Sequence, residues 1–245
     1  MRSTLNRKHY ARRRRQLMRM MHENSVAILP SAPTLIRNRD VEHGFRQDSD
    51  FMYLSGFNEP ESVLVLIPNR KQGEFVMFCR DRDPAKETWD GRRYGIEGAV
   101  EHFDADDAYP IDDLEEILPG LMEDRESVYY SIGLNPAFDK HVLKCMNDLR
   151  AQSRRGARVP YEFVSLEYLL HDMRLYKSRE EISLMRKAAK ISVQAHINAM
   201  QVCQPGMYEY ELEAEFLCAF KRNGADWAYS SIVGGGENGC ILHYT

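Results

Sequence analysis

The end of the chain holds the residues whose types and spacing could support chemistry. Residues 230–245 read SSIVGGGENGCILHYT and place Gly234, Gly236 and Gly239 in a G-x-G-x-x-G pattern, ahead of His243. That pattern is typical of dinucleotide-binding loops, in which glycine amides approach a pyrophosphate at the start of a helix. The same residues could instead form a turn that directs the imidazole of His243 at a substrate.

The residues that follow the glycines favour the turn. Residues 240–245, CILHYT, are rich in strand-forming side chains and lack a helical period, whereas a phosphate loop opens a helix. Glu237 would also set a negative charge against a phosphate. We therefore predict strands over 226–233 and 240–245, joined by glycines that supply positive φ angles or a close backbone approach. A histidine in a strand is usually structural, so spacing alone leaves the role of His243 open.

The composition is that of an ordinary globular protein. Of the 245 residues, 43% are hydrophobic and 29% are charged, and the net charge of -4 predicts neither nucleic acid nor an anionic membrane as a partner. No apolar run approaches the ~18 residues of a membrane-spanning helix. The five cysteines are scattered and form no C-x-x-C pair. This usage predicts reduced thiols and a cytoplasmic location, with neither a disulfide framework nor a zinc knuckle.

The first 21 residues carry eight Lys or Arg and no Asp or Glu. No apolar region follows these charges, so the segment is not a secretory signal. The spacing predicts an amphipathic helix with Tyr10, Leu17, Met18 and Met21 on its apolar face and the arginines in solvent. The alternative is an acidic contact for the arginines, such as another subunit.

The elements up to residue 150 alternate between strands and helices. Strands are predicted at 25–30, 62–68, 74–80 and 127–133, the second and third forming a hairpin. Helices are predicted at 110–122, stopping near Pro119, and at 136–152. The second helix is expected to hold Phe138, Val142, Cys145, Met146 and Leu149 on one side. Residues 81–99 are interpreted as a polar surface loop that contains Trp89, and Phe163, Leu166, Tyr168 and Leu169 as interdomain core. The pattern indicates an α/β domain with a mixed sheet, and we place the domain division at 1–172 and 173–245.

Two helices are predicted after the division. Ser178 and Glu181 form a capping box that opens a long helix. Its apolar residues recur at helical spacing: Ile182, Met185, Ala189, Val193, His196, Ile197 and Met200. A second helix over 210–224 ends at Gly224.

Several of these stretches resemble one family. RQDSDFMYLSGFNEPESVLVLIP (46–68) and RDPAKETWDGRRYGIEGA (82–99) resemble the N-terminal domain of bacterial-type Xaa-Pro aminopeptidases. RLYKSREEISLMRKAAKISVQAH (174–196) resembles the opening helix of the pita-bread catalytic domain that they share with prolidases and creatinases. The resemblance implies an aminopeptidase P N-terminal α/β domain, creatinase-like and with a mixed sheet, followed by an incomplete pita-bread α+β domain.

The resemblance also implies a role for three residues. His243 matches the substrate-site histidine of the family, which donates a hydrogen bond to the scissile region. Tyr229 would lie near the metal site, and Trp89 matches a tryptophan that family tetramers lend to a neighbouring subunit. A core tyrosine and a packed loop anchor are the alternatives for Tyr229 and Trp89.

The function that the resemblance implies is a metalloaminopeptidase that uses two divalent ions, usually Mn, to release the residue before proline. The metal ligands of the family follow the position of His243 by more than a dozen residues, and no metal-ligand motif stands within the 245 residues. We therefore expect the chain alone to bind no metal specifically and to be inactive. Proline-containing peptides and further copies of the chain, joined through the N-terminal domain, are the expected partners. The alternatives are a non-catalytic assembly module and a prolidase-type dipeptidase.

Overall fold

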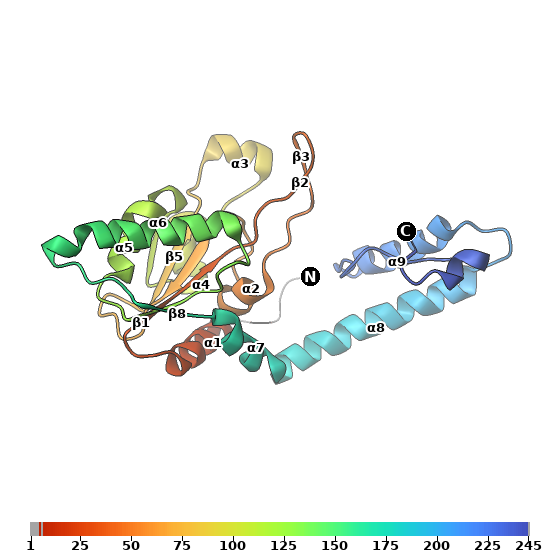
Figure 1. Ribbon diagram of the computed structural model, residues 1–245. Coiled ribbons are helices and arrows are strands. Elements are labelled where there is room, and N and C mark those ends of the chain that lie inside the picture. Colours follow the sequence, from red (N-terminus) through yellow and green to blue (C-terminus); the bar gives the residue numbers. More distant parts are fainter. Residues whose placement is uncertain (1–4, 6, 245) are drawn as a thin grey trace. The chain divides into compact units, whose positions relative to one another are not determined.

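The computed structural model describes Leu5 and residues 7–244 of the chain. They form two compact units, which divide between Tyr176 and Lys177. Figure 1 labels their helices and strands.

The first unit is built on a six-stranded sheet in the order β6-β5-β4-β1-β7-β8. The strands are β1 (Ser25–Pro30), β4 (Val63–Leu66), β5 (Phe75–Cys79), β6 (Asp107–Pro110), β7 (Ser127–Tyr129) and β8 (Glu162–Val164). β4 runs antiparallel to β1 and β5, and the other neighbours are parallel. The predicted mixed sheet and the β4–β5 hairpin are confirmed. A separate exposed ribbon pairs β2 (Ile36–Asn38) with β3 (Val41–Glu42).

Helices cover both faces of the sheet (Figure 1). A hydrophobic core lies on each face of the sheet. Alternate residues of β1 point to opposite faces, so Val26 and Ile28 belong to one core and Ala27 to the other. On the Ala27 side pack α1 (Arg7–Met20), α2 (Ser49–Ser55), α4 (Gly95–Phe103) and α7 (Leu166–Leu175). On the opposite side pack α5 (Leu114–Met122), preceded by the short η1 (Ile111–Asp113), and α6 (Pro136–Gln152), followed by η2 (Ser153–Arg155).

The helix α6 matches its predicted range. Its buried residues are the five that the spacing predicted: Phe138, Val142, Cys145, Met146 and Leu149. The prediction for α5 needs a correction, because the helix continues through Pro119 to Met122. Leu121 and Met122 are buried in the core, and this packing extends the helix past a residue that ordinarily ends one.

The prediction of a loop over residues 81–99 is wrong. The segment contains α3 (Pro84–Asp90) and the first half of α4. The Asp83 side chain accepts hydrogen bonds from the amides of Ala85 and Lys86, and Pro84 occupies the first turn. This N-cap followed by proline was the local signal for a helix.

The solvated arginine face predicted for α1 is also wrong at two positions. Arg13 and Arg14 are each only 4% exposed. The Arg14 guanidinium donates to the carbonyl of Leu54 at 3.0 Å and stacks over the Phe75 ring at 4.0 Å. Arg13 donates to the Tyr53 carbonyl at 3.0 Å. Backbone carbonyls at the end of α2 therefore replace the water that the two charges lose.

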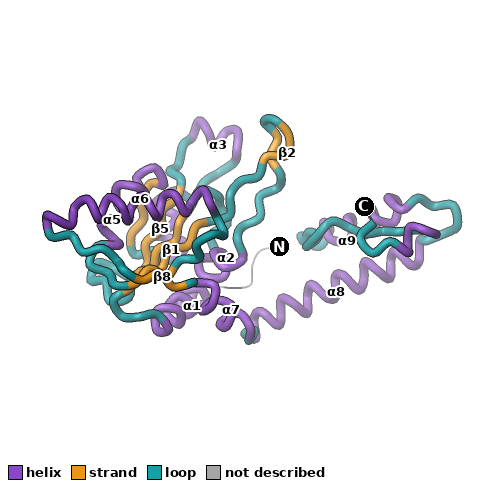
Figure 2. The backbone as a smooth tube through the Cα atoms, viewed as in Figure 1, coloured by secondary structure: helices purple, strands orange, loops and turns teal. Residues whose placement is uncertain are grey.

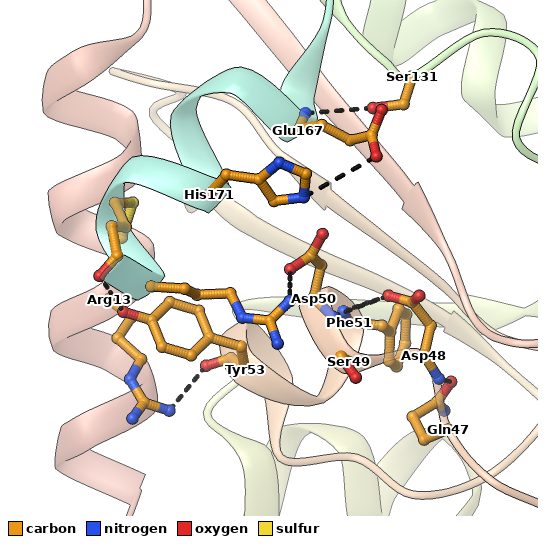
Figure 3. Close-up of polar contacts among 12 residues, drawn as sticks. Arg13, Gln47, Asp48, Ser49, Asp50, Phe51, Tyr53, Ser131, Glu167 and His171 are labelled. Carbon is orange, nitrogen blue, oxygen red and sulfur yellow. Dashed lines mark hydrogen bonds and ion pairs between the residues drawn. The ribbon is translucent and has the colours of Figure 1, made fainter. Parts of the chain in front are cut away.

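The helix α7 belongs to the core of the first unit. Leu166, Leu169, Leu170 and Met173 are buried in it. Tyr168, predicted to be core, is 78% exposed because the buried positions recur at helical spacing and leave residue 168 on the opposite face. Arg174 of α7 pairs with Asp50 of α2, and the Tyr53 hydroxyl donates to the carbonyl of Met173. Figure 3 labels Asp50 and Tyr53 on α2 and Glu167 and His171 on α7.

The second unit contains α8 (Arg179–Val202) and α9 (Glu209–Arg222). The capping box is confirmed: the Ser178 amide donates to Glu181 at 2.8 Å, and the Glu181 amide donates to the Ser178 hydroxyl at 3.3 Å. Gly224 follows α9 with a φ of 63°, as predicted for a helix end.

The apolar stripe predicted for α8 is not its buried side. The buried residues are Ile191, Ala195 and Ala199, whereas Met185 and Met200 are more than half exposed. Two alanines on the buried side let α9 approach closely, and the ring of Phe216 on α9 meets His196 edge-on at 4.8 Å.

The two strands predicted near the end of the chain are absent from the described residues. Figure 2 draws residues after α9 as loop, apart from the short η3 (Gly236–Cys240). A strand needs a neighbour for its backbone ladder, and no described segment pairs with residues 226–233 or 240–244.

Candidate active site

A hollow of about 570 Å³ lies between the start of α9 and the glycine segment, defined as residues 234–240. Polar side chains on both sides line it, among them Glu209, Glu213, Asn238 and Tyr244. The segment that carries His243 therefore folds back over the first turn of α9.

One carboxylate organises this hollow. The Gly235 amide donates to Glu209 Oε1 at 2.6 Å, and Asn238 Nδ2 donates to the same oxygen at 2.9 Å. The Tyr244 hydroxyl accepts from the same Asn238 Nδ2 at 3.0 Å, and it interacts with Glu209 closely enough for each group to shift the pKa of the other. Two residues of the glycine segment thus donate to one carboxylate of α9, and Asn238 connects Tyr244 to them.

These hydrogen bonds fix the protonation of both acidic groups. The Gly235 amide, with help from Asn238 and Tyr244, lowers the pKa of Glu209. The interaction with Glu209 raises the pKa of Tyr244. Glu209 is therefore anionic and Tyr244 neutral at neutral pH.

The glycines do what the turn interpretation expected of them. Gly236 has a φ of 54°, in the left-handed region. A Cβ on Gly234 would lie 2.9 Å from the backbone of Asn238 and Gly239, too close for any side chain. The interpretation as a phosphate-binding loop has no support. The Gly235 amide already donates to the carboxylate of Glu209, and the helix that follows, η3, has only five residues.

The predicted site residues lie at exposed positions. His243 is exposed and directly precedes Tyr244, while Tyr229 is 77% exposed. Among the described residues, neither side chain lines the hollow, so the structure does not bring Tyr229 and His243 together there.

Trp89 lies on α3 in the first unit and is 88% exposed. An indole with so little contact is not a packed loop anchor, which was the structural alternative for this residue. A basic hollow of about 610 Å³, lined by Arg82, Arg92, Arg93, Tyr94 and His102, lies in the same part of the fold.

The residues present do not fit a two-metal centre. Nowhere in residue 5 or residues 7–244 do three or more His, Cys, Asp or Glu side chains gather to hold a metal ion. The densest acidic stretch, DADDAYPIDD, is used internally: Asp106 accepts from the amides of Glu74 and Phe75, and Asp107 pairs with Arg70 at 2.7 Å. In the same described range, no helix is long and apolar enough to cross a membrane.

Two family models match the chain. Residues 10–129 match the N-terminal domain of aminopeptidase P, and residues 183–245 match metallopeptidase family M24. The fold agrees with a solved structure, that of Pseudomonas aeruginosa aminopeptidase PepP, with a TM-score of 0.96 and 56% identity over 98% of this chain.

The chain belongs to the aminopeptidase P family.

Curated relatives in this family cover nearly all of the chain. Xaa-Pro aminopeptidase of Escherichia coli K12 is 41% identical over 99% of this chain and 56% of its own length. The Haemophilus influenzae enzyme of the same name is 36% identical over 98% of this chain and 54% of its own length. Our chain thus spans about half the length of the aminopeptidase P relatives that it matches.

Sequence reasoning missed Glu209, Asn238 and Tyr244. A partial signal was present, because a glycine-rich segment leaves backbone amides in need of acceptors and Glu209 stands at the start of a helix. The partners of Glu209 lie 26 and 29 residues away in the sequence, and no local pattern connects positions so far apart.

Proposed function

We propose that the protein containing these residues is an Xaa-Pro aminopeptidase, a metal-dependent hydrolase that releases the N-terminal residue when proline follows. The observation that carries the proposal is the match to enzymes of that name along 99% of this chain, through the segment that contains His243. The names of the relatives supply the substrate class, and family M24 supplies the metallopeptidase chemistry.

We assign His243 to the substrate site. An imidazole that donates a hydrogen bond to the scissile carbonyl would stabilise the negative charge that develops there during attack. The exposure of His243 supports this role, because its imidazole is accessible to a bound peptide. Tyr229, also exposed, is assigned to the surroundings of the metal ions.

Two divalent cations, with manganese as the expected metal, would activate the attacking water. The described residues offer no donor set for these cations. We propose that the 245 residues alone neither hold these cations specifically nor cleave peptides.

The N-terminal unit is proposed to join copies of the protein, with Trp89 reaching a neighbouring subunit. The Trp89 indole is 88% exposed, so its apolar surface would be stabilised by burial against a partner. The same observation favours a second function for the isolated chain, that of a non-catalytic assembly module. A prolidase-type dipeptidase is the alternative peptidase.

A cytoplasmic location is proposed from the thiols. The five cysteines are unpaired, and burial raises the pKa of Cys79 to about 12 and that of Cys145 to about 11. Buried thiols of this kind are unreactive and suit a reducing compartment.

Peptide cleavage tests the proposal. The complete protein, supplied with manganese, should release the first residue of an Xaa-Pro-Xaa tripeptide and should act poorly on an Xaa-Pro dipeptide, the prolidase substrate. His243→Ala should lower kcat by roughly 10²-fold or more. Preference for the dipeptide would support prolidase instead, and cleavage by the 245-residue polypeptide would refute its proposed inactivity.

Assembly is tested separately by light scattering. Trp89→Ala in the complete protein should reduce the oligomer fraction and the activity together, whereas Tyr161→Ala, at a tyrosine that is 77% exposed on the same unit, should change neither. A monomeric wild-type protein would contradict the assembly role of Trp89.

A further inference from the structure

Glu209 holds the glycine segment from a rigid position. It is the first residue of α9, a 14-residue helix that packs on α8. Side chains on helices are placed more precisely than those on loops. The carboxylate therefore offers a fixed acceptor to a segment that has little regular structure of its own.

The glycine segment depends on that acceptor. Within the described residues, its backbone hydrogen bonds are local, from the Asn238 amide to the Gly235 carbonyl and from the Ile241 amide to the Asn238 carbonyl. In the described part of the chain, the hydrogen bonds that tie the segment to a helix end on Glu209. Three successive glycines, residues 234–236, would otherwise leave this backbone with many accessible conformations.

The anchoring extends to the residue beside the candidate catalytic histidine. The Tyr244 hydroxyl accepts from Asn238 Nδ2, which also donates to Glu209, while the Gly235 amide donates to Glu209 directly, so both ends of the stretch between Gly235 and Tyr244 are linked to one carboxylate. His243 lies inside this stretch. The backbone on each side of the imidazole is therefore restrained from α9.

We propose that Glu209 is a positioning residue: by binding Gly235 and Asn238, and through Asn238 holding Tyr244, it sets the place of His243 for the reaction. The catalytic part of this inference rests on the proposed aminopeptidase function. Proton transfer is not the role of Glu209, because the Gly235 amide and Asn238 donate to its carboxylate and keep it ionised. Its contribution is the precision with which the imidazole meets the scissile carbonyl, where displacement by about 1 Å costs roughly 10²-fold in rate.

The test uses the complete protein with Glu209→Gln, which keeps the side-chain length and removes the charge. We expect kcat to fall roughly ten- to hundredfold while KM changes much less. In a His243→Ala background the same substitution should cost almost nothing further, because both residues act through the imidazole. Glu215→Gln, on the same helix but outside the hollow, is the matched control and should keep wild-type kcat. An unchanged kcat, or losses that multiply independently of His243, would overturn the proposal.

A structural readout separates this inference from the proposed function. In the same proteins, Glu209→Gln should accelerate hydrogen exchange of the Gly235 amide by roughly tenfold and bring the pKa of Tyr244 back toward its ordinary value. If the wild-type protein cleaves no Xaa-Pro peptide, the proposed function fails, yet these two measurements still decide whether Glu209 holds the segment. Unchanged exchange and an unchanged Tyr244 pKa would show that it does not.

If Glu209→Gln does not fold, Tyr244→Phe is the variant that tests the proposal. It leaves the Gly235 and Asn238 hydrogen bonds to Glu209 in place and removes only the hydroxyl that accepts from Asn238, so exchange at Gly235 should rise by a smaller factor and kcat should fall by a smaller factor. Wild-type values for both quantities would contradict the proposal on their own.

Discussion

Arg14 is a charged side chain that lies in the interior of the first unit. Desolvation lowers its pKa to about 10, partly opposed by Asp104 and Asp106, so the guanidinium remains protonated at neutral pH. Its Nη1 donates to the Leu54 carbonyl at 3.0 Å, and its Nη2 donates to the Phe103 carbonyl at 3.4 Å. A planar fork with several donors can satisfy two carbonyls in different directions, which a lysine ammonium on its flexible stem does less well.

Arg14→Lys is therefore expected to lower the free energy of unfolding by about 1.5–3 kcal/mol, because the protein loses hydrogen bonds that the charged guanidinium donates. Urea denaturation measures the change. Arg15→Lys, at the neighbouring exposed position of α1, is the control and should stay within about 0.5 kcal/mol of the wild type. Equal effects at the two positions would contradict the structural role of Arg14.

Two glycines in helices of the first unit differ in the space around the position of a Cβ. Gly120 lies in α5 with open space around the position of a Cβ. Gly98 lies in α4, where a Cβ would come within 2.9 Å of the Cβ of Tyr94. Neither glycine has a positive φ. Helix propensity favours alanine at both positions, so the surroundings decide whether alanine raises or lowers the stability.

Gly120→Ala is expected to stabilise the first unit by about 0.5–1 kcal/mol, because alanine loses less backbone entropy in a helix. Gly98→Ala should destabilise it by about 1–3 kcal/mol, since the added methyl group forces Tyr94 to shift. Thermal unfolding measures both variants. The same direction of change in both would show that propensity, and not local space, governs these positions.

At the scale of the molecule, the two units divide after Tyr176, and α7 completes the first. Met173 is 6% exposed in the core, and Arg174 pairs with Asp50 of α2. The division proposed from the sequence, 1–172 and 173–245, falls within α7 and remains a prediction that truncation can test.

A polypeptide of residues 1–176 should unfold cooperatively and be more stable than one of residues 1–172. The shorter form loses the buried Met173 side chain, which alone contributes roughly 1.5–3 kcal/mol, and it also loses the ion pair to Asp50. Urea denaturation of the two polypeptides measures the difference. Equal stability would support the division at residue 172.

Local patterns determined much of this protein. The range and buried side of α6, the capping box at Ser178 and the β4–β5 hairpin all depend on neighbours within a few residues. The family resemblance followed from quoted stretches and holds across the chain. Such features could be predicted because helix periods, caps and turn residues act over short sequence distances.

Only the tertiary structure decided the rest. It placed Arg13 and Arg14 against carbonyls about 40 residues away, and it brought Gly235 and Asn238 to Glu209. It also left residues 240–244 without a strand, although their composition favours one. Burial of a charge, the partner of a carboxylate and the pairing of a strand all depend on groups distant in the sequence, so the side chains near His243 gave no local sign of what holds them.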